Sequence, residues 1–90
     1  MIIFSNLSSN PAAIKLLEQN QDKIDWEEFS GNPAAIKLLE QNQNKINWRY
    51  LSMNENPAAI KLLEKNQDKI NWEKLSSNPA IFKSYKYKNK

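Results

Sequence analysis

Apolar residues are grouped along this chain in a pattern that recurs three times. In each copy a block of apolar residues follows Asn-Pro, and a polar stretch separates the block from an Ile-x-Trp segment. The first block is AAIKLLEQ at 12–19, and its five apolar side chains cover an arc of roughly 200° when residues are placed at about 100° intervals. The pattern predicts an α-helix, and an arc this wide must be covered on two sides.

Each of these helices is expected to start at an Asn-Pro pair. Asparagine can accept the N–H groups that a first turn leaves unpaired, and proline fits the first helical position because its missing N–H costs nothing there. Asn-Pro stands at 10–11, 32–33, 56–57 and 78–79. Asn20, Asn42 and Asn66 are expected to end the helices, since asparagine tolerates the left-handed conformation that closes a last turn.

A second, shorter element is predicted in IDWEEF, INWRYL and INWEKL. The residue before each Trp can cap it, and these residues are Asp25, Asn47 and Asn71. Because Ser-x-Asn-Pro follows so soon, we expect a single α or 3-10 turn. Each Trp stands three residues before a Phe or Leu, so we expect the rings of Trp26, Trp48 and Trp72 to stack in the interior.

We therefore expect an all-α protein, an α-solenoid in which each 22–24-residue repeat contains a longer α-helix and a short α or 3-10 helix. We place it in one domain over 1–90, with a half-repeat at 1–9 and full repeats at 10–31, 32–55 and 56–77. A capping half-repeat at 78–86 and a basic tail to residue 90 follow. Two inserted residues lengthen the junction SMNENP relative to SGNP.

The ends of the chain fit the same register. IIFSNLSSNP at 2–11 aligns with IDWEEFSGNP at 24–33, which puts Phe4 at the Trp position. NPAIFKSYK at 78–86 aligns with NPAAIKLLE at 10–18, where Ser84 replaces a Leu and Lys86 replaces a Glu, so we expect a polar terminal cap. The recurring prolines argue against a continuous coiled coil, and the regular Ile, Leu and Trp argue against disorder.

The phased unit N-P-x-A-I-x-L-L-E-x-N-x-D-K-I-x-W-x-x-L-S resembles the short Asn-Pro…Trp tandem repeats of many predicted proteins of giant DNA viruses, the mimivirus-like group. Tandem copies in those proteins often finish in a segment similar to NPAIF at 78–82. The resemblance covers nearly the whole chain and implies a viral repeat protein in the cytoplasm of an infected host cell, but it brings no catalytic residues. The architecture is also similar to leucine-rich repeat variant solenoids, at the level of fold alone.

The side-chain inventory limits the chemistry. The chain has no Cys and no His, which excludes disulfides, thiolate or imidazole metal ligands, and catalysis by Ser-His or Cys-His pairs. We expect no enzyme activity, no cofactor and no metal site. The apolar start Met1–Phe4 is followed at once by Ser5 and Asn6, too soon for a signal peptide or a membrane span. A soluble intracellular protein without a membrane partner is expected.

Positive charge is concentrated at one end of the chain. The net charge is +3, and the stretch KSYKYKNK at 83–90 holds four of the 13 basic residues and no acid. The basic tail residues are Lys83, Lys86, Lys88 and Lys90. Two further lysine ladders recur through the repeats, at Lys15, Lys37 and Lys61 and at Lys23, Lys45 and Lys69. The tail and the ladders give an alternative function, weak binding of nucleic acid or another anionic surface. Acids stand beside the ladders, so we do not expect nucleic acid to be the partner.

Positions that differ between the copies are the ones free to recognise something. The pairs Glu27-Glu28, Arg49-Tyr50 and Glu73-Lys74 differ completely, and Met53 and Glu55 belong to the inserted loop. Arg and Tyr are enriched among binding hot spots. These residues are the candidate surface of a non-catalytic scaffold for protein–protein interaction, with a protein partner of unknown identity. Self-association through the apolar end at Met1, Ile2 and Ile3 is a further expectation.

Overall fold

The computed structural model describes residues 2–85, and over this range the chain is all-helical, as the sequence pattern predicts. Eight α-helices are found there: α1 (Phe4–Ser8), α2 (Ile14–Glu18), α3 (Trp26–Ser30), α4 (Ile36–Gln41), α5 (Trp48–Ser52), α6 (Pro57–Glu64), α7 (Trp72–Ser76) and α8 (Ala80–Tyr85). Four 3-10 helices join them, namely η1 (Pro11–Ala13), η2 (Gln21–Lys23), η3 (Gln43–Lys45) and η4 (Gln67–Lys69).

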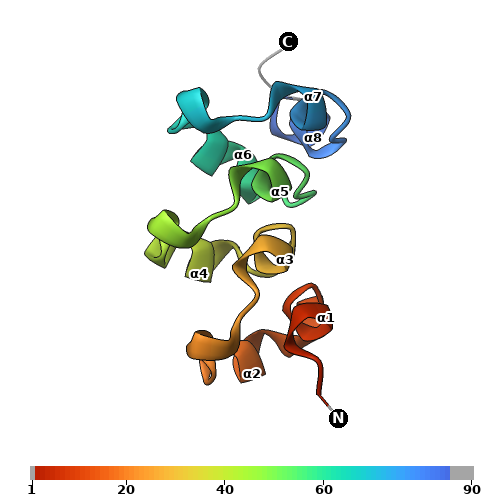
Figure 1. Cartoon of the computed structure of the whole chain (residues 1–90). Helices are drawn as coiled ribbons and strands as arrows, with labels where there is room; N and C mark the ends of the chain where they lie inside the picture. The colour runs from red at the N-terminus through yellow and green to blue at the C-terminus, as the bar shows by residue number, and fades with distance from the viewer. Residues whose placement is uncertain (1, 86–90) are drawn as a thin grey trace.

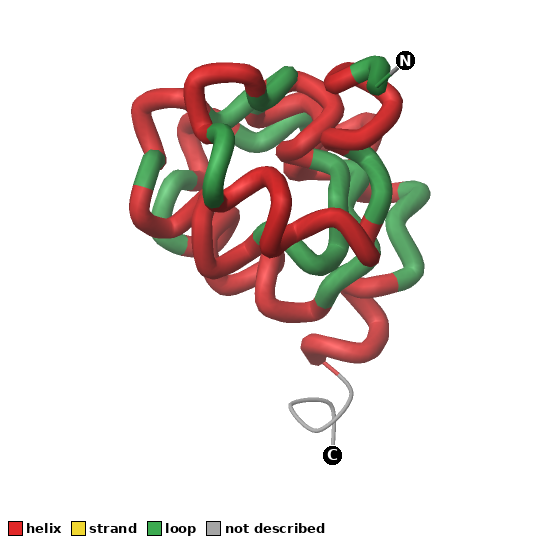
Figure 2. The backbone as a smooth tube through the Cα atoms, turned by 90° about the horizontal axis from the view of Figure 1, so that it is seen from below, coloured by secondary structure: helices red, strands yellow, loops and turns green. Residues whose placement is uncertain are grey.

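The helices are arranged in four successive levels, each made of a short helix and the helix that follows it: α1 with α2, α3 with α4, α5 with α6, and α7 with α8. Figure 1 shows the chain advancing level by level, with its two ends at opposite ends of the molecule. Contacts join α1 to α3, α3 to α5 and α5 to α7, and likewise α4 to α6 and α6 to α8. The molecule measures 48 × 24 × 21 Å, and the levels overlap when it is viewed from below in Figure 2.

One apolar core runs through all the levels. Its most deeply buried members include the second leucine of α2, α4 and α6, represented by Leu39, and the side chains of Phe29 and Leu51 on the short helices. Burying a leucine side chain contributes about 1.5–3 kcal/mol. The repeated apolar positions therefore meet in one continuous interior.

The predicted asparagine caps are confirmed, but only α6 begins as an α-helix at its Asn-Pro pair; α2 begins at Ile14 after the 3-10 turn η1, and α4 and α8 begin at Ile36 and Ala80. Asn10, Asn32, Asn56 and Asn78 each accept, through Oδ1, the backbone N–H of the residue two places on. The short helices are capped as expected as well, because Asp25, Asn47 and Asn71 each accept the N–H of the residue three places on. The short element is an α-helix, and the 3-10 turns η2, η3 and η4 lie in the connection that precedes it, whereas η1 leads directly into α2.

The predicted left-handed helix ends are wrong. None of the described non-glycine residues has a positive φ, and Asn20, Asn42 and Asn66 have φ of −136°, −137° and −137°. Instead, the side-chain Nδ2 of each asparagine donates to the carbonyl four residues earlier, on Leu16, Leu38 and Leu62. The side chain itself satisfies a carbonyl near the end of the helix, so no unusual backbone conformation is needed.

The prediction that the tryptophans stack in the interior is also wrong. Trp26 and Trp48 are half-buried and Trp72 is 59% exposed, whereas the residue three places on is buried in each case. A lysine of the next connection covers the ring: Lys45 Nζ lies 5.1 Å from the centre of the Trp26 ring, and Lys69 Nζ lies 5.3 Å from that of Trp48. The rings thus lie at the rim of each level, beneath a cation and its aliphatic stem.

Buried asparagines tie each level to the one before it. The Nδ2 group of Asn32 donates to the carbonyls of Ser8 and Asn10, at 3.0 and 3.1 Å. The same pair of bonds recurs from Asn54 to Ser30 and Asn32, and from Asn78 to Ser52 and Asn54. We call these six bonds the asparagine ladder.

Serines provide a second set of bonds between levels. The Oγ atoms of Ser8, Ser30 and Ser52 accept the backbone N–H groups of Asp25, Asn47 and Asn71, at 2.9, 2.9 and 3.0 Å. Each of these serines also donates to the carbonyl four residues earlier in its own helix. The hydroxyl is therefore fully used, and all three serines are buried.

The asparagine ladder also corrects the position of the insertion. The pattern assigned Met53-Asn54-Glu55 to an inserted surface loop, with Asn56 as the counterpart of Asn32. The structure gives the ladder position to Asn54, which is buried, whereas Asn56 caps α6. Asn32 both makes the ladder bonds and caps the turn that follows, whereas here Asn54 makes the ladder bonds and Asn56 provides the cap. The extra residues are therefore Glu55 and Asn56.

The asparagine ladder predicts unequal effects of the same substitution at two helix starts. Asn32→Ala should destabilise the protein by roughly 2–4 kcal/mol, because it leaves the buried Ser8 carbonyl and the Ala34 N–H without partners and removes one of the two bonds to the Asn10 carbonyl. Asn10→Ala removes only an exposed cap and should cost roughly 0.5–2 kcal/mol. Urea midpoints of the two variants measure the difference, and equal midpoints would show that the ladder adds nothing to capping.

A second pair of variants tests how stability is distributed along the levels. Ile36 is buried between levels, whereas Ile14 in the first level is only half-buried. Ile36→Ala should cost about 2–5 kcal/mol, the usual range for a buried isoleucine, and Ile14→Ala should cost less and mainly loosen the amino-terminal end. Segment-resolved hydrogen exchange with urea midpoints makes the comparison. Equal losses with uniformly reduced protection would contradict it.

Candidate functional site

The variable residues lie on the short helices, one above another. Because α3, α5 and α7 succeed each other along one side of the molecule (Figure 1), the second and third residues of each helix form a column across three levels. Glu27, Arg49 and Glu73 are exposed in this column, and Glu28, Tyr50 and Lys74 are half-buried. The structure therefore places the six variable residues along one side, with one exposed member in each level.

Tyr50 contributes to packing as well as to the surface. A Cβ atom added to Gly31 would lie 3.7 Å from Cδ2 of Tyr50, so the tyrosine ring lies against the end of the preceding short helix. Arg49 is exposed at the same level and is free of that constraint. Of the pair that the sequence singled out, Arg49 is the residue that can be changed without disturbing packing between levels.

A groove joins four of the eight predicted surface residues. It has a volume of about 410 Å³ and is lined by Met53, Glu55, Glu73, Lys74, Ser77, Asn78 and Pro79. The buried side chain of Asn54 holds the loop down through the asparagine ladder, while Met53, which is 46% exposed, and Glu55 project on either side of it. The other four predicted residues, Glu27, Glu28, Arg49 and Tyr50, do not line this groove.

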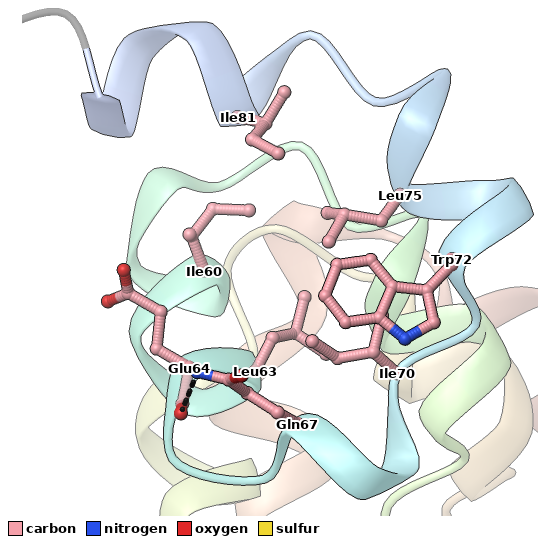
Figure 3. Close-up of a pocket in the computed structure, with 8 residues that line it drawn as sticks. All are labelled: Ile60, Leu63, Glu64, Gln67, Ile70, Trp72, Leu75 and Ile81. Atoms are coloured by element: carbon pink, nitrogen blue, oxygen red, sulfur yellow. Dashed lines mark hydrogen bonds between the residues drawn. The ribbon is translucent and has the colours of Figure 1, made fainter. Parts of the chain in front are cut away.

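A second cavity was not foreseen from the sequence. It has a volume of about 200 Å³ and lies at the carboxy-terminal end, lined by Ile60, Leu63, Glu64, Gln67, Ile70, Trp72, Leu75 and Ile81. Figure 3 shows Ile60 and the Trp72 ring on opposite sides, with Ile81 above them. Ile70 is half-buried here, although Ile24 and Ile46 at the same position are buried. The available signal in the sequence was Ser84, which stands at a Leu position of the repeat in the last helix.

The lysines separate into two groups. Lys23, Lys45 and Lys69 lie over the aromatic rings of Phe4, Trp26 and Trp48, so this ladder has a structural partner. The ladder on the longer helices, Lys15, Lys37 and Lys61, is exposed. Lys83 belongs to α8, and Lys86, Lys88 and Lys90 lie outside the described residues.

The described residues contain neither a metal-binding cluster nor a membrane-spanning helix. Within residues 2–85, no group of three or more acidic side chains is placed to hold a metal ion. No helix in the same range has the length and apolar character needed to cross a bilayer.

The chain matches no protein-family model, and no curated protein or solved structure is significantly similar to it.

Proposed function

We propose that this chain is an α-solenoid scaffold that binds a protein partner and catalyses no reaction. The proposal rests on the observation that invariant and variable positions of the repeat have different roles in the structure. Residues identical in every copy, such as the ladder asparagines and the serines, make the bonds between levels. Residues that differ, among them Met53, Glu73 and Lys74, line a groove on the surface.

The chemistry of this groove suits a short segment of another protein. The exposed Met53 side chain is flexible and polarisable, so it can adapt to an apolar side chain of a partner. Glu55, Glu73 and Lys74 line the same groove and offer both signs of charge at its edge. An apolar residue flanked by charged ones would match this arrangement, with the charges contributing specificity more than affinity.

The non-catalytic part of the proposal rests on the inventory of side chains. Histidine and cysteine are absent from the sequence, and the two carboxylates that line the groove, Glu55 and Glu73, share it with Lys74. The setting, a giant-virus protein acting in the cytoplasm of an infected cell, rests on the resemblance of the repeat motif.

A photo-crosslinking residue placed at Met53 tests the proposed groove. We expect it to form adducts with a discrete protein in a cell lysate, because a partner in the groove would lie against this position. The same residue at the exposed Lys37 on α4 is the control and should form no such adduct. Exchanging two charges, Glu73→Lys with Lys74→Glu, preserves the net charge and should abolish the Met53 adduct. Adducts that are the same from both positions, or that survive the exchange, would reject the groove.

The alternative function, binding of an anionic surface, is favoured by the exposed Lys15, Lys37 and Lys61, which recur at one position of the longer helices. We expect the full chain to bind a labelled oligonucleotide weakly at low salt and not at moderate salt, since few phosphates would be neutralised. Fluorescence anisotropy for the full chain and for a chain ending at Phe82 makes the measurement. Binding that persists at moderate salt and disappears on truncation would favour the basic tail over the protein-binding groove.

A further inference from the structure

The last level has hydrogen-bond acceptors, and the first level has hydrogen-bond donors, of the kinds that join one level to the next inside the chain. At the carboxy-terminal end, Ser76 holds the position of Ser8, Ser30 and Ser52, and Asn78 holds that of the ladder asparagines. Within the described residues the Ser76 Oγ accepts no backbone N–H, and no asparagine side chain donates to the carbonyls of Ser76 or Asn78. Ser76 is exposed, whereas its three counterparts are buried.

The amino-terminal end carries the matching donors. Ile3 precedes α1 as Asp25 precedes α3, and its N–H has no acceptor within residues 2–85. Asn10 accepts the Ala12 N–H through Oδ1, but its Nδ2 group likewise has no acceptor among the described residues. These are the two donor groups that Asp25 and Asn32 present to the level below them.

Exposed apolar side chains lie at both ends, on the same levels as these donors and acceptors. Trp72, which lines the cavity shown in Figure 3, is 59% exposed, and Phe82 on α8 is 75% exposed. Ile2 and Ile3 are 60% and 53% exposed at the other end, where a hollow of about 330 Å³ is lined by Ile2, Ile3, Asn6, Leu7 and Asn10. Within residues 2–85, the predicted polar cap thus leaves the side chains of Trp72 and Phe82 exposed.

We propose that a second copy of this chain stacks its first level onto the last level of the first copy. The Ile3 N–H of the second copy then donates to the Ser76 Oγ of the first, and its Asn10 Nδ2 donates to the carbonyls of Ser76 and Asn78. The proposal rests on the solenoid architecture proposed above and names one partner of the scaffold as the chain itself.

The positions of the donors and acceptors favour a second copy of the chain as the partner. A different partner would have to present a backbone N–H and a side-chain amide in the arrangement found three times inside the chain. The amino-terminal end of the chain already presents both. Because the joined surfaces differ, the contact is head-to-tail and leaves one free end of each kind, so the assembly stays open to further copies.

Two end variants test the inference. The head variant combines Ile3→Glu with Asn10→Asp, since aspartate keeps the oxygen that accepts the Ala12 N–H but lacks the Nδ2 donor. The tail variant combines Ser76→Ala with the change Phe82→Glu at an exposed position. Lys37→Glu, on an exposed position of α4, is the control. Circular dichroism verifies that each variant keeps its helices.

Sedimentation velocity over about a 100-fold range of concentration provides the readout. We expect the unaltered chain and the Lys37→Glu control to sediment faster as concentration rises, and each end variant alone to remain monomeric. A mixture of the two end variants should form a dimer and nothing larger, because it contains one intact head and one intact tail. A monomeric unaltered chain would overturn the inference. So would a head variant that still dimerises by itself, which would show pairing of like ends. Adduct formation at Met53 is a separate measurement, so the groove and the end contact can fail independently.

Discussion

The structure depends on a backbone requirement that only the next level can satisfy. At each junction the carbonyl of the serine that ends the short helix, such as Ser8, accepts no other N–H among the described residues and is covered by the level that follows. The carbonyl of Asn10, which already accepts the Ala13 N–H, takes a second hydrogen bond from the same level. A buried carbonyl without a donor costs about 1–3 kcal/mol. The side-chain amide of Asn32 supplies both hydrogens, and its Oδ1 accepts the Ala34 N–H at the same time. Aspartate lacks the donors and serine has a single one, so the position calls for asparagine.

This requirement explains why the copies resemble each other so closely. The apolar core provides most of the stabilisation, but leucines and isoleucines could pack in several registers with similar energy. The asparagine ladder and the serine bonds are satisfied in one register alone, because a shift of a single residue would leave buried donors and acceptors unpaired at every junction. The polar groups therefore specify the arrangement that the apolar groups stabilise, and both sets must be preserved together in every copy.

The sequence correctly predicted the capping bonds between neighbouring residues at helix starts, and it did not predict the bonds between residues far apart in the chain. Caps such as Asn47 act on an N–H three residues away, so the pattern identified them correctly. The ladder bonds span 22 to 26 residues. In the insertion Asn54 keeps the spacing from the serine and Asn56 keeps the proline, and the local sequence does not say which of the two features decides the ladder position. The exposure of Trp72 likewise reflects what lies above it. For the candidate site, the variable positions were found correctly, but which of them share a groove depends on where the insertion folds.

The direction of the bonds between levels has a consequence for the molecule as a whole. Every junction uses acceptors of the earlier level and donors of the later one, so a stack of such levels has unlike ends whatever its length. Closing the acceptor end requires something that covers both Ser76 and the aromatic surface at Trp72 and Phe82. Within the described residues α8 packs on α6 but leaves these groups open. A further level is the arrangement already shown to satisfy such a surface, and its first residues would have to offer the donors that Ile3 and Asn10 hold. The same bonds that fix the register within the chain thus define the chemistry of its two ends.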